Sequence, residues 1–176
     1  MEQTIQANAE EKAVAASAGF PPIARGDARI LILGSLPGQR SLDARQYYAH
    51  PQNAFWRIMR DLVGAEGTYE RRCRALLGHR IALWDVLASS VRPGSMDADI
   101  RLKTAQANDF NDFFINHREL ERIAFNGRKA AQLFASMVEL PPRDGVVGQF
   151  VLPSTSPAYA SMSYAAKLDA WRRVLA

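Results

Sequence analysis

The residue types best suited to chemistry gather in two neighbouring stretches of this chain. The first is a Gly-x-x-Pro-Gly turn, Gly34 to Gly38, which follows the apolar run Leu31-Ile32-Leu33. The second is the polar and aromatic stretch from Gln46 to Trp56, which contains His50 and Asn53. Glycines let a backbone approach a ligand closely, and free N–H groups in such turns bind anions or carbonyl oxygens. The pattern places functional groups just beyond the carboxyl end of a strand, where open α/β sheets bind ligands.

Strands and helices must hold these groups, and four apolar β-type runs are present. Each ends in a turn signal or a polar residue, and they cover residues 29–33, 80–86, 122–125 and 149–152. Between them, apolar residues recur every three or four positions, as in residues 55–62, 130–138 and 168–175. Asn108 is suited to cap a further helix that runs to Asn116. The alternation predicts an α/β fold, a three-layer α/β/α sandwich with a central, mostly parallel four-stranded sheet.

In a parallel sheet with uniform crossovers, the loops after the strands lie along one edge. This arrangement predicts that Gly34 to Gly38, Asp85, Asn126-Gly127 and Pro153 to Ala158 come together. Glycine, proline, serine and amide groups dominate that set. A nucleotide is the ligand that such an edge suggests.

Length and composition favour one globular domain. The chain has 176 residues, of which 48% are hydrophobic and 23% charged, and the domain is expected over residues 20–176. Residues 1–19 lack aromatic side chains and are expected to form a flexible or loosely docked N-terminal arm. No apolar run reaches the roughly 20 residues of a membrane span, so we expect a soluble protein. The single cysteine, Cys73, excludes an internal disulfide and is compatible with a reducing cytoplasm.

The net charge of +4 favours a polyanionic partner such as nucleic acid. Basic residues cluster locally, for example at Arg71-Arg72 with Arg74 and at Arg172-Arg173. The alternative is that these clusters are the solvated faces of helices.

Five segments, in order, resemble the uracil-DNA glycosylase superfamily, and within it the hypoxanthine (deoxyinosine) DNA glycosylase branch. They are Gly34-Ser35-Leu36-Pro37-Gly38, Tyr47-Tyr48-x-His50-Pro51-Gln52-Asn53-x-Phe55-Trp56, Leu83-Trp84-Asp85-Val86, Phe125-Asn126-Gly127 and Leu152-Pro153-Ser154-Thr155-Ser156-Pro157-Ala158. The resemblance extends from about residue 28 to the C-terminus. It implies an enzyme that removes a damaged base from DNA without a metal or a cofactor.

Such an enzyme must flip the nucleotide out of the duplex into a snug pocket. Bond cleavage builds positive charge on the sugar and negative charge on the departing base, so a placed water and dipoles aimed at the base are needed. Several relatives position the water with an Asp or Asn where this chain has Leu36. The resemblance then gives the water-orienting or base-orienting role to Asn53. The alternative is that Asn53 caps the helix near Phe55.

The other predicted pocket residues each have a structural alternative. His50 either donates to a base oxygen or only supports its loop, and Tyr47 and Tyr48 sandwich the base or anchor the loop. Phe55 lines the pocket floor or packs in the core. Around them, Ser35, Leu36, Pro37 and Gly38 would contact base or water through main-chain atoms. At the strand ends, Asp85 orients water or a tyrosine hydroxyl or else binds turn amides, and Asn126 reads the base edge or forms an Asn-Gly turn.

The last motif is predicted to contact the DNA backbone. Hydroxyls and N–H groups of Ser154, Thr155, Ser156, Pro157 and Ala158 would grip phosphates, or the segment is a turn that caps the last helix. Tyr159 is suited to fill the gap left by the flipped base. Many members of the superfamily carry a histidine here, and this chain has none, so its leaving group must be stabilised from elsewhere.

These observations predict a monofunctional DNA repair glycosylase that excises a deaminated base, hypoxanthine first and uracil or xanthine as further candidates. A β-eliminating lyase needs a lysine or another amine as its nucleophile. The lysines of this chain are Lys12, Lys103, Lys129 and Lys167, and none falls in a motif. The alternatives are a G:U/G:T mismatch-specific uracil/thymine DNA glycosylase and a catalytically inactive nucleic-acid-binding module of the same fold. A monomer is expected, with DNA as its partner.

Overall fold

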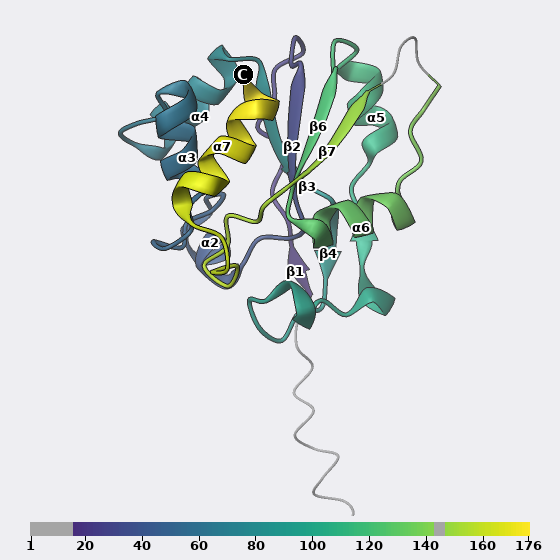
Figure 1. Cartoon of the computed structure of the whole chain (residues 1–176). Helices are drawn as coiled ribbons and strands as arrows, with labels where there is room; N and C mark the ends of the chain where they lie inside the picture. Colours follow the sequence, from purple (N-terminus) through teal and green to yellow (C-terminus); the bar gives the residue numbers. More distant parts are fainter. Residues whose placement is uncertain (1–15, 143–146) are drawn as a thin grey trace, which may run out of the picture.

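The computed structural model describes residues 16–142 and 147–176, and its centre is a four-stranded parallel sheet. The strands are β2 (Ile30–Gly34), β3 (Ile81–Asp85), β6 (Arg122–Asn126) and β7 (Gly148–Leu152), in the order β3-β2-β6-β7. The register pairs Gly34 with Asp85 and Asn126 with Leu152, so all four strands end at one edge. The predicted strands and sheet are confirmed (Figure 1).

Burial on both faces explains why β2 reads as an uninterrupted apolar run. Every residue from Ile30 to Gly34 is buried, as is every residue of β3. Strands in the middle of a parallel sheet are covered by helices on both sides and therefore carry few polar residues.

Two helical layers cover the sheet. One contains α3 (Phe55–Val63), α4 (Tyr69–Gly78) and α7 (Tyr164–Leu175), and the other contains α5 (Phe110–Asn116) and α6 (Arg128–Met137) (Figure 1). Aromatic contacts join helices within each layer. The ring centroids of Phe55 and Trp171 are 6.0 Å apart, and those of Phe110 and Phe134 are 5.2 Å apart. The three-layer α/β/α sandwich is thus present. The short helix α2 (Gln39–Ala44) lies between the first motif and the aromatic stretch.

A second, antiparallel sheet was not predicted. It has the order β1-β4-β5 and consists of β1 (Ser17–Ala18), β4 (Leu87–Ser90) and β5 (Gln106–Ala107). β1 belongs to the expected N-terminal arm, and its pairing with β4 holds that end of the arm in extended form. Residues 1–15 of the arm lie outside the described residues. Between β4 and β5 lie the 3₁₀ turns η1 (Asp97–Asp99) and η2 (Leu102–Thr104).

The predicted cap of α5 is wrong by one residue. Asp109, rather than Asn108, accepts the hydrogen bond from the Asp112 backbone N–H, at 2.9 Å. The Asn108 side chain has another partner, because its Nδ2 donates to the Asp85 carbonyl oxygen at 2.8 Å. Asn108 therefore holds the end of β3 instead of the start of α5.

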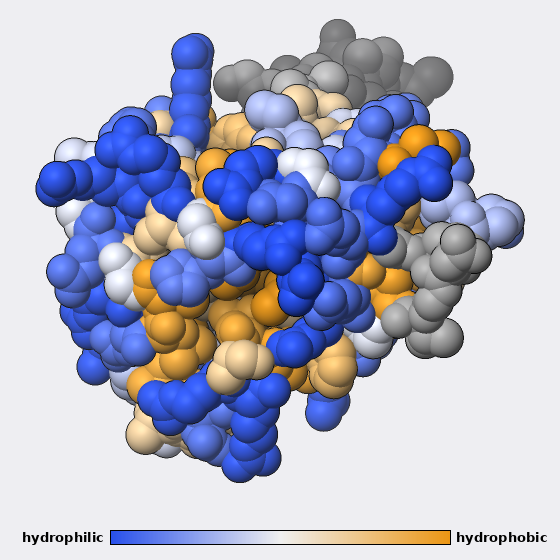
Figure 2. Space-filling view, turned by 90° about the horizontal axis from the view of Figure 1, so that it is seen from above, coloured by the Kyte–Doolittle hydropathy of each residue, from blue (hydrophilic) through white to orange (hydrophobic). Residues whose placement is uncertain are grey.

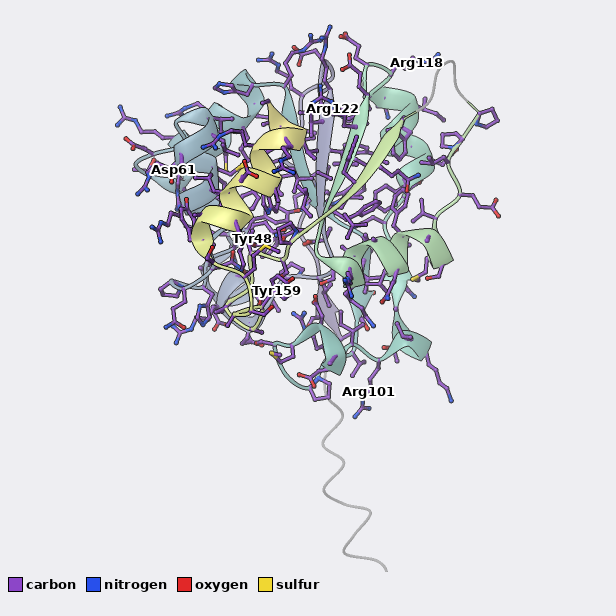
Figure 3. The ribbon with its side chains drawn as sticks, viewed as in Figure 1. Tyr48, Asp61, Arg101, Arg118, Arg122 and Tyr159 are labelled. Carbon is purple, nitrogen blue, oxygen red and sulfur yellow. The ribbon has the colours of Figure 1, made fainter. Side chains whose placement is uncertain are left out.

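The end of the sheet at which the strands begin carries paired charges. Arg29 lies 3.5 Å from Glu121, and Arg80 forms an ion pair with Glu119. Arg122 donates to the Val174 carbonyl oxygen. Figure 2 views this end from above, and hydrophilic residues predominate there around a hydrophobic area. Figure 3 places Arg122 at this end and Tyr159 toward the opposite end. No helix in the described ranges is long and apolar enough to span a membrane.

Candidate active site

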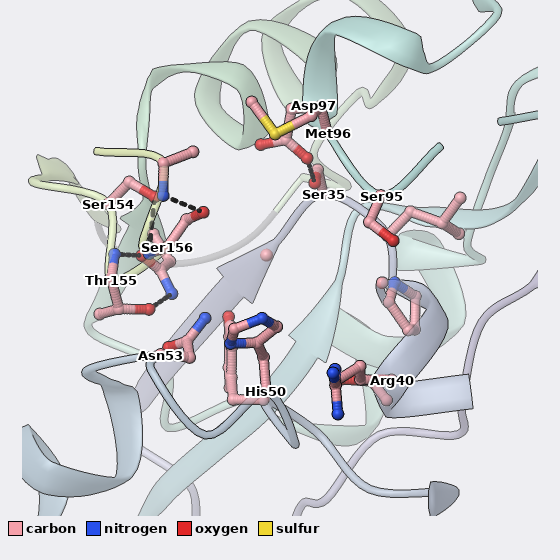
Figure 4. A pocket seen from close by; sticks show the side chains of 18 of the residues that line it. Ser35, Arg40, His50, Asn53, Ser95, Met96, Asp97, Ser154, Thr155 and Ser156 are labelled. Carbon is pink, nitrogen blue, oxygen red and sulfur yellow. Dashed lines mark hydrogen bonds between the residues drawn. The ribbon is translucent and has the colours of Figure 1, made fainter. Parts of the chain in front are cut away.

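A pocket of about 610 Å³ lies at the edge where the four parallel strands end. Almost every residue that the sequence predicted for the site lines it. They are Gly34, Ser35, Leu36, Pro37, Gly38, Tyr47, Tyr48, His50, Asn53, Asp85, Asn126, Ser154, Thr155, Ser156, Pro157, Ala158 and Tyr159. In Figure 4, Asn53, His50 and Arg40 lie along one side of the pocket, Ser154 to Ser156 along a second, and Ser35 and Asp97 opposite.

Phe55 does not line the pocket, which favours its alternative reading as a core residue. Its side chain is completely buried and stacks on Tyr48, with 4.1 Å between ring centroids. It also contacts Trp171 of α7. Phe55 thus supports the pocket wall from behind.

The two tyrosines have different surroundings. The Tyr47 hydroxyl donates to the Pro21 carbonyl oxygen at 3.0 Å, and its ring meets Phe20 edge-on, so Tyr47 anchors the loop. The Tyr48 hydroxyl is buried and has no hydrogen-bond partner. Burial, and then the charge of Asp85, raise the pKa of Tyr48, so its hydroxyl stays protonated. Tyr48 also has a positive φ of 54°, which few residues other than glycine adopt.

Gly34 makes room for this arrangement. A Cβ atom at position 34 would collide with Asp85 Oδ1 and lie 2.9 Å from the Tyr48 hydroxyl. No side chain larger than hydrogen fits there without displacing both groups. The first glycine of the motif therefore brings a phenol and a carboxyl group close to the same point of the backbone.

Asp85 is buried at the end of β3, with 4% of its surface exposed. Its Oδ2 atom has no hydrogen-bond partner. Burial, and then the charge of Asp97, raise the pKa of the Asp85 carboxyl group to about 7, against the opposing effect of Arg92. Near neutral pH this group therefore exists in both protonation states.

Asn53 has one end of its amide occupied. Oδ1 accepts a hydrogen bond from the Phe55 backbone N–H at 3.0 Å, which fixes the first turn of α3. Because Oδ1 faces that N–H, Nδ2 is left to donate into the pocket, as Figure 4 shows. Ala54 is the N-cap residue of α3, so the predicted cap at Asn53 is wrong by one residue, but this turn hydrogen bond still leaves Nδ2 for an orienting role.

His50 is held in one tautomer by its own loop. Its Nδ1 accepts a hydrogen bond from the Gln52 backbone N–H at 3.2 Å. Nε2 must therefore carry the proton in the neutral ring. As His50 lines the pocket, it offers an N–H donor there.

Asn126 is bound on both sides of its amide to the last motif. Nδ2 donates to Thr155 Oγ1 at 2.8 Å, and Oδ1 accepts from the Thr155 backbone N–H at 2.9 Å. Asn126 lines the pocket, but its amide is occupied by these two contacts. They favour a structural role, in which Asn126 holds the loop, and not the predicted role of recognising the base edge.

In the last motif, the hydroxyl groups of the serines are free to bind an outside ligand, whereas several backbone N–H groups are already engaged within the loop. The N–H of Ser156 donates to Ser154 Oγ, and that of Ala158 donates to Ser156 Oγ, each at 3.2 Å. Both hydroxyls keep their own protons for an outside acceptor. Phosphate contacts by this loop would therefore fall to the hydroxyls of Ser154 and Ser156.

Comparisons with known proteins agree with this geometry. The model of the family described as "Uracil DNA glycosylase superfamily" matches residues 21–175. The chain belongs to this superfamily. A protein named hypoxanthine DNA glycosylase from Methanosarcina barkeri is 38% identical over 117 residues, which are 65% of this chain and 73% of the relative. A protein of the same name from Methanosarcina acetivorans matches with the same identity and coverage.

A solved structure also shares the fold. The solution NMR structure of a Methanosarcina acetivorans protein, provisionally described as a uracil DNA glycosylase, has a TM-score of 0.74 and 34% sequence identity. It covers 92% of this chain, and the match covers 97% of that protein. Membership of the superfamily places the chain among the DNA glycosylases, as the sequence predicts.

Three charged residues of this glycosylase pocket, Arg40, Arg92 and Asp97, were missed by sequence reasoning. Arg92 is buried and donates to the carbonyl oxygens of Leu36 and Pro37, and these hydrogen bonds fix the backbone of the first motif. Asp97 Oδ1 accepts a hydrogen bond from the Ser35 hydroxyl at 2.5 Å. Arg92 and Asp97 belong to the segment after β4, which has no apolar periodicity. The Arg-Pro-Gly sequence at Arg92 was the one available signal, and it indicates only a turn.

Replacing Asn126 with alanine is expected to destabilise the protein by about 1–3 kcal/mol, because the buried Thr155 N–H loses its acceptor. The free energy of unfolding from urea titrations measures this change. Asn116→Ala is a matched control, since the Asn116 amide only donates to Asp112 on the exposed face of α5. A loss no larger than that of Asn116→Ala would mean that the Asn126–Thr155 pair does not hold the loop.

Proposed function

We propose that this protein is a monofunctional DNA glycosylase that hydrolyses the N-glycosidic bond of a flipped, deaminated base, with hypoxanthine as its main substrate. The observation that carries the proposal is the set of hydrogen-bond donors directed into the pocket. They are His50 Nε2–H and Asn53 Nδ2–H.

Deamination replaces an exocyclic amine, which donates hydrogen bonds, with a carbonyl oxygen, which accepts them. N–H donors such as those of His50 and Asn53 therefore match a deaminated base. Adenine would present its amine to these donors, and buried polar groups left without partners cost about 1–3 kcal/mol each. The donor set thus supports selection against undamaged adenine and cytosine.

Hypoxanthine is favoured over uracil by the relatives, because two curated proteins that are similar to this chain bear the name hypoxanthine DNA glycosylase. Uracil also carries carbonyl oxygens, which keeps the mismatch-specific uracil/thymine glycosylase as the alternative. Leu36, buried with 6% exposed surface, offers no polar group to a water molecule. Because an alkyl side chain cannot position the attacking water, Leu36 is the residue that supports the alternative of a catalytically inactive binding module.

The proposed reaction is hydrolysis rather than β-elimination. No lysine is among the described residues that line the pocket, and Lys167 Nζ instead donates to the Tyr159 carbonyl oxygen at 2.6 Å. In a dissociative reaction the sugar is already oxocarbenium-like when water attacks, so dipoles that orient the water and stabilise the base suffice. The proposal includes no metal or cofactor.

The substrate is proposed to be damaged DNA held from the side of the last motif. The hydroxyls of Ser154 and Ser156 contact phosphates, and Tyr159, whose side chain is partly exposed, fills the gap in the base stack. Lys167 Nζ lies over the Tyr159 ring, 5.1 Å from its centroid. A monomeric, cytoplasmic enzyme is part of this proposal.

The test is cleavage of labelled duplexes that carry one deoxyinosine or one deoxyuridine, under single-turnover conditions. We expect alkali-dependent strand breaks at deoxyinosine at least about tenfold faster than at deoxyuridine, the discrimination that about 1.4 kcal/mol gives. Breaks without alkali would contradict the monofunctional reaction. Faster cleavage at deoxyuridine would support the mismatch enzyme, and binding of both duplexes without cleavage would support the inactive module.

A further inference from the structure

Asp85 is a buried acid whose role is not explained by the fold. Of the residues that the structure describes, it is the only acidic residue that is buried. It lines the pocket, and its Oδ2 atom is enclosed and has no hydrogen-bond partner. A structural carboxylate at a strand end is expected to bind turn amides. Its backbone carbonyl holds Asn108, whereas its Oδ2 accepts no hydrogen bond.

The charged and titratable groups around Asp85 come from two segments. Tyr47 and Tyr48 belong to the stretch after α2, and Arg92 and Asp97 to the segment after β4. Arg92 donates to main-chain carbonyl oxygens of the first motif and lies 4.0 Å from Asp97 in an ion pair, and the Ser35 hydroxyl donates to Asp97. Buried without a direct cationic partner and close to a second acid, Asp85 is surrounded by conditions that favour its neutral form.

The position of Asp85 in the sheet directs it to the base rather than to the sugar. In the sheet order β3-β2-β6-β7, the two outer strands are β3 and β7. The phosphate loop, defined as residues 153–159, follows β7, and Asp85 is the last residue of β3, on the opposite side of the sheet. A nucleotide held by its phosphates at that loop extends its base across β6 and β2 toward β3. Asp85 then faces the base, while the sugar carbon that water attacks lies nearer the phosphate loop.

We propose that Asp85 is the general acid of the reaction and donates its carboxyl proton to a ring nitrogen, N3 or N7, of the purine leaving group. As the bond from C1′ to N9 breaks, its electron pair passes to the purine, which leaves as neutral hypoxanthine with the proton from Asp85. Water adds to C1′ and loses a proton, which restores the Asp85 carboxyl group directly or through solvent. The inference rests on the proposed function and specifies how its leaving group is stabilised.

This role accounts for the missing histidine of the last motif. A purine has ring nitrogens that accept a proton before the bond breaks, so a proton donor replaces an anion-stabilising histidine. General acid catalysis contributes typically about 10²–10⁴-fold to a rate.

The test is the pH dependence of single-turnover deoxyinosine cleavage between about pH 5 and 9. For the unaltered protein we expect a rate that is constant at low pH and falls about tenfold per pH unit above a midpoint near 7, as the carboxyl proton is lost. Asp85→Asn is expected to be at least about a hundredfold slower at pH 6, with the alkaline fall abolished. Asp97→Asn is expected to move the midpoint to lower pH, because the charge of Asp97 raises the pKa of Asp85.

Folding of each variant is checked by its thermal midpoint and by binding to a duplex with an abasic-site analogue. A rate that rises with pH through this range would overturn the inference and make Asp85 a base that activates water. Asp85→Asn with the rate and pH profile of the unaltered protein would overturn it too, while the glycosylase proposal stands. Absence of deoxyinosine cleavage at every pH by the unaltered protein would overturn both.

Discussion

Asn53→Ala is expected to slow deoxyinosine cleavage by about 10²–10³-fold, the usual effect of removing one well-placed donor from an active site. The expectation follows from the different partners of the two polar atoms of the Asn53 amide. Oδ1 is engaged by the Phe55 N–H, so Nδ2 acts in the pocket as a donor to the base or to the water oxygen. Single-turnover rates on a deoxyinosine duplex measure the effect. Loss of the hydrogen bond from the Phe55 N–H adds a destabilisation of about 1 kcal/mol.

Asn53→Asp separates the two roles of this residue. A carboxylate still accepts the hydrogen bond from the Phe55 N–H and so keeps the turn before α3, but it offers no N–H donor. We therefore expect Asn53→Asp to be as stable as the unaltered protein and nearly as slow as Asn53→Ala. Gln52→Ala, at the exposed neighbouring position, is the control and is expected to retain full activity. Full activity of Asn53→Asp would show that the pocket needs an acceptor at this position.

The second large effect concerns stability. The unaltered protein is expected to lose up to about 4 kcal/mol of unfolding free energy, relative to Asp85→Asn, as the pH rises from about 4 to about 8. The folded state raises the pKa of Asp85 from 3.8 to about 7 and therefore binds this proton more tightly than the unfolded chain. The stabilising contribution is complete below about pH 4 and is lost as the pH rises through 7.

Urea unfolding of both proteins at several pH values measures this difference. The comparison with Asp85→Asn cancels other carboxyl groups, such as Asp27 and Asp61. Their hydrogen bonds to Arg25 and Tyr164 lower the pKa of each, so protonation of these groups costs stability on the acid side. Parallel stability curves for the two proteins would show that Asp85 is ionised throughout this pH range and would remove the basis for its role as an acid.

The sequence was sufficient to predict the strands and the edge at which they end. Buried parallel strands are uninterrupted apolar runs, so each polar residue that follows one, such as Asp85 or Asn126, marks a position at the same edge. Since right-handed crossovers bring those ends together, the pocket lining followed from the order of the motifs. Among the residues predicted to line the pocket, only Phe55 does not line it, because its ring packs in the core against Tyr48.

Pairings between distant residues could not be predicted in this way. The bonds between Asn126 and Thr155, and between Ser35 and Asp97, join residues 29 and 62 positions apart. No local pattern encodes such a partner, because it depends on how separate loops meet in space. The small sheet escaped prediction for a related reason, since strands of two residues, such as β1 and β5, are too short to show a period.

The buried position of Leu36 restricts how the reaction chemistry of this pocket can change by substitution. An acidic side chain introduced there would be desolvated in a site that already contains Asp85 and Asp97, and charges of like sign at short range oppose one another's ionisation. An acid at position 36 and an acid at position 85 are therefore competing solutions within one pocket. Conversion of this protein to the arrangement of relatives with an acidic first motif requires both positions to change together, and either single step leads through a less functional intermediate.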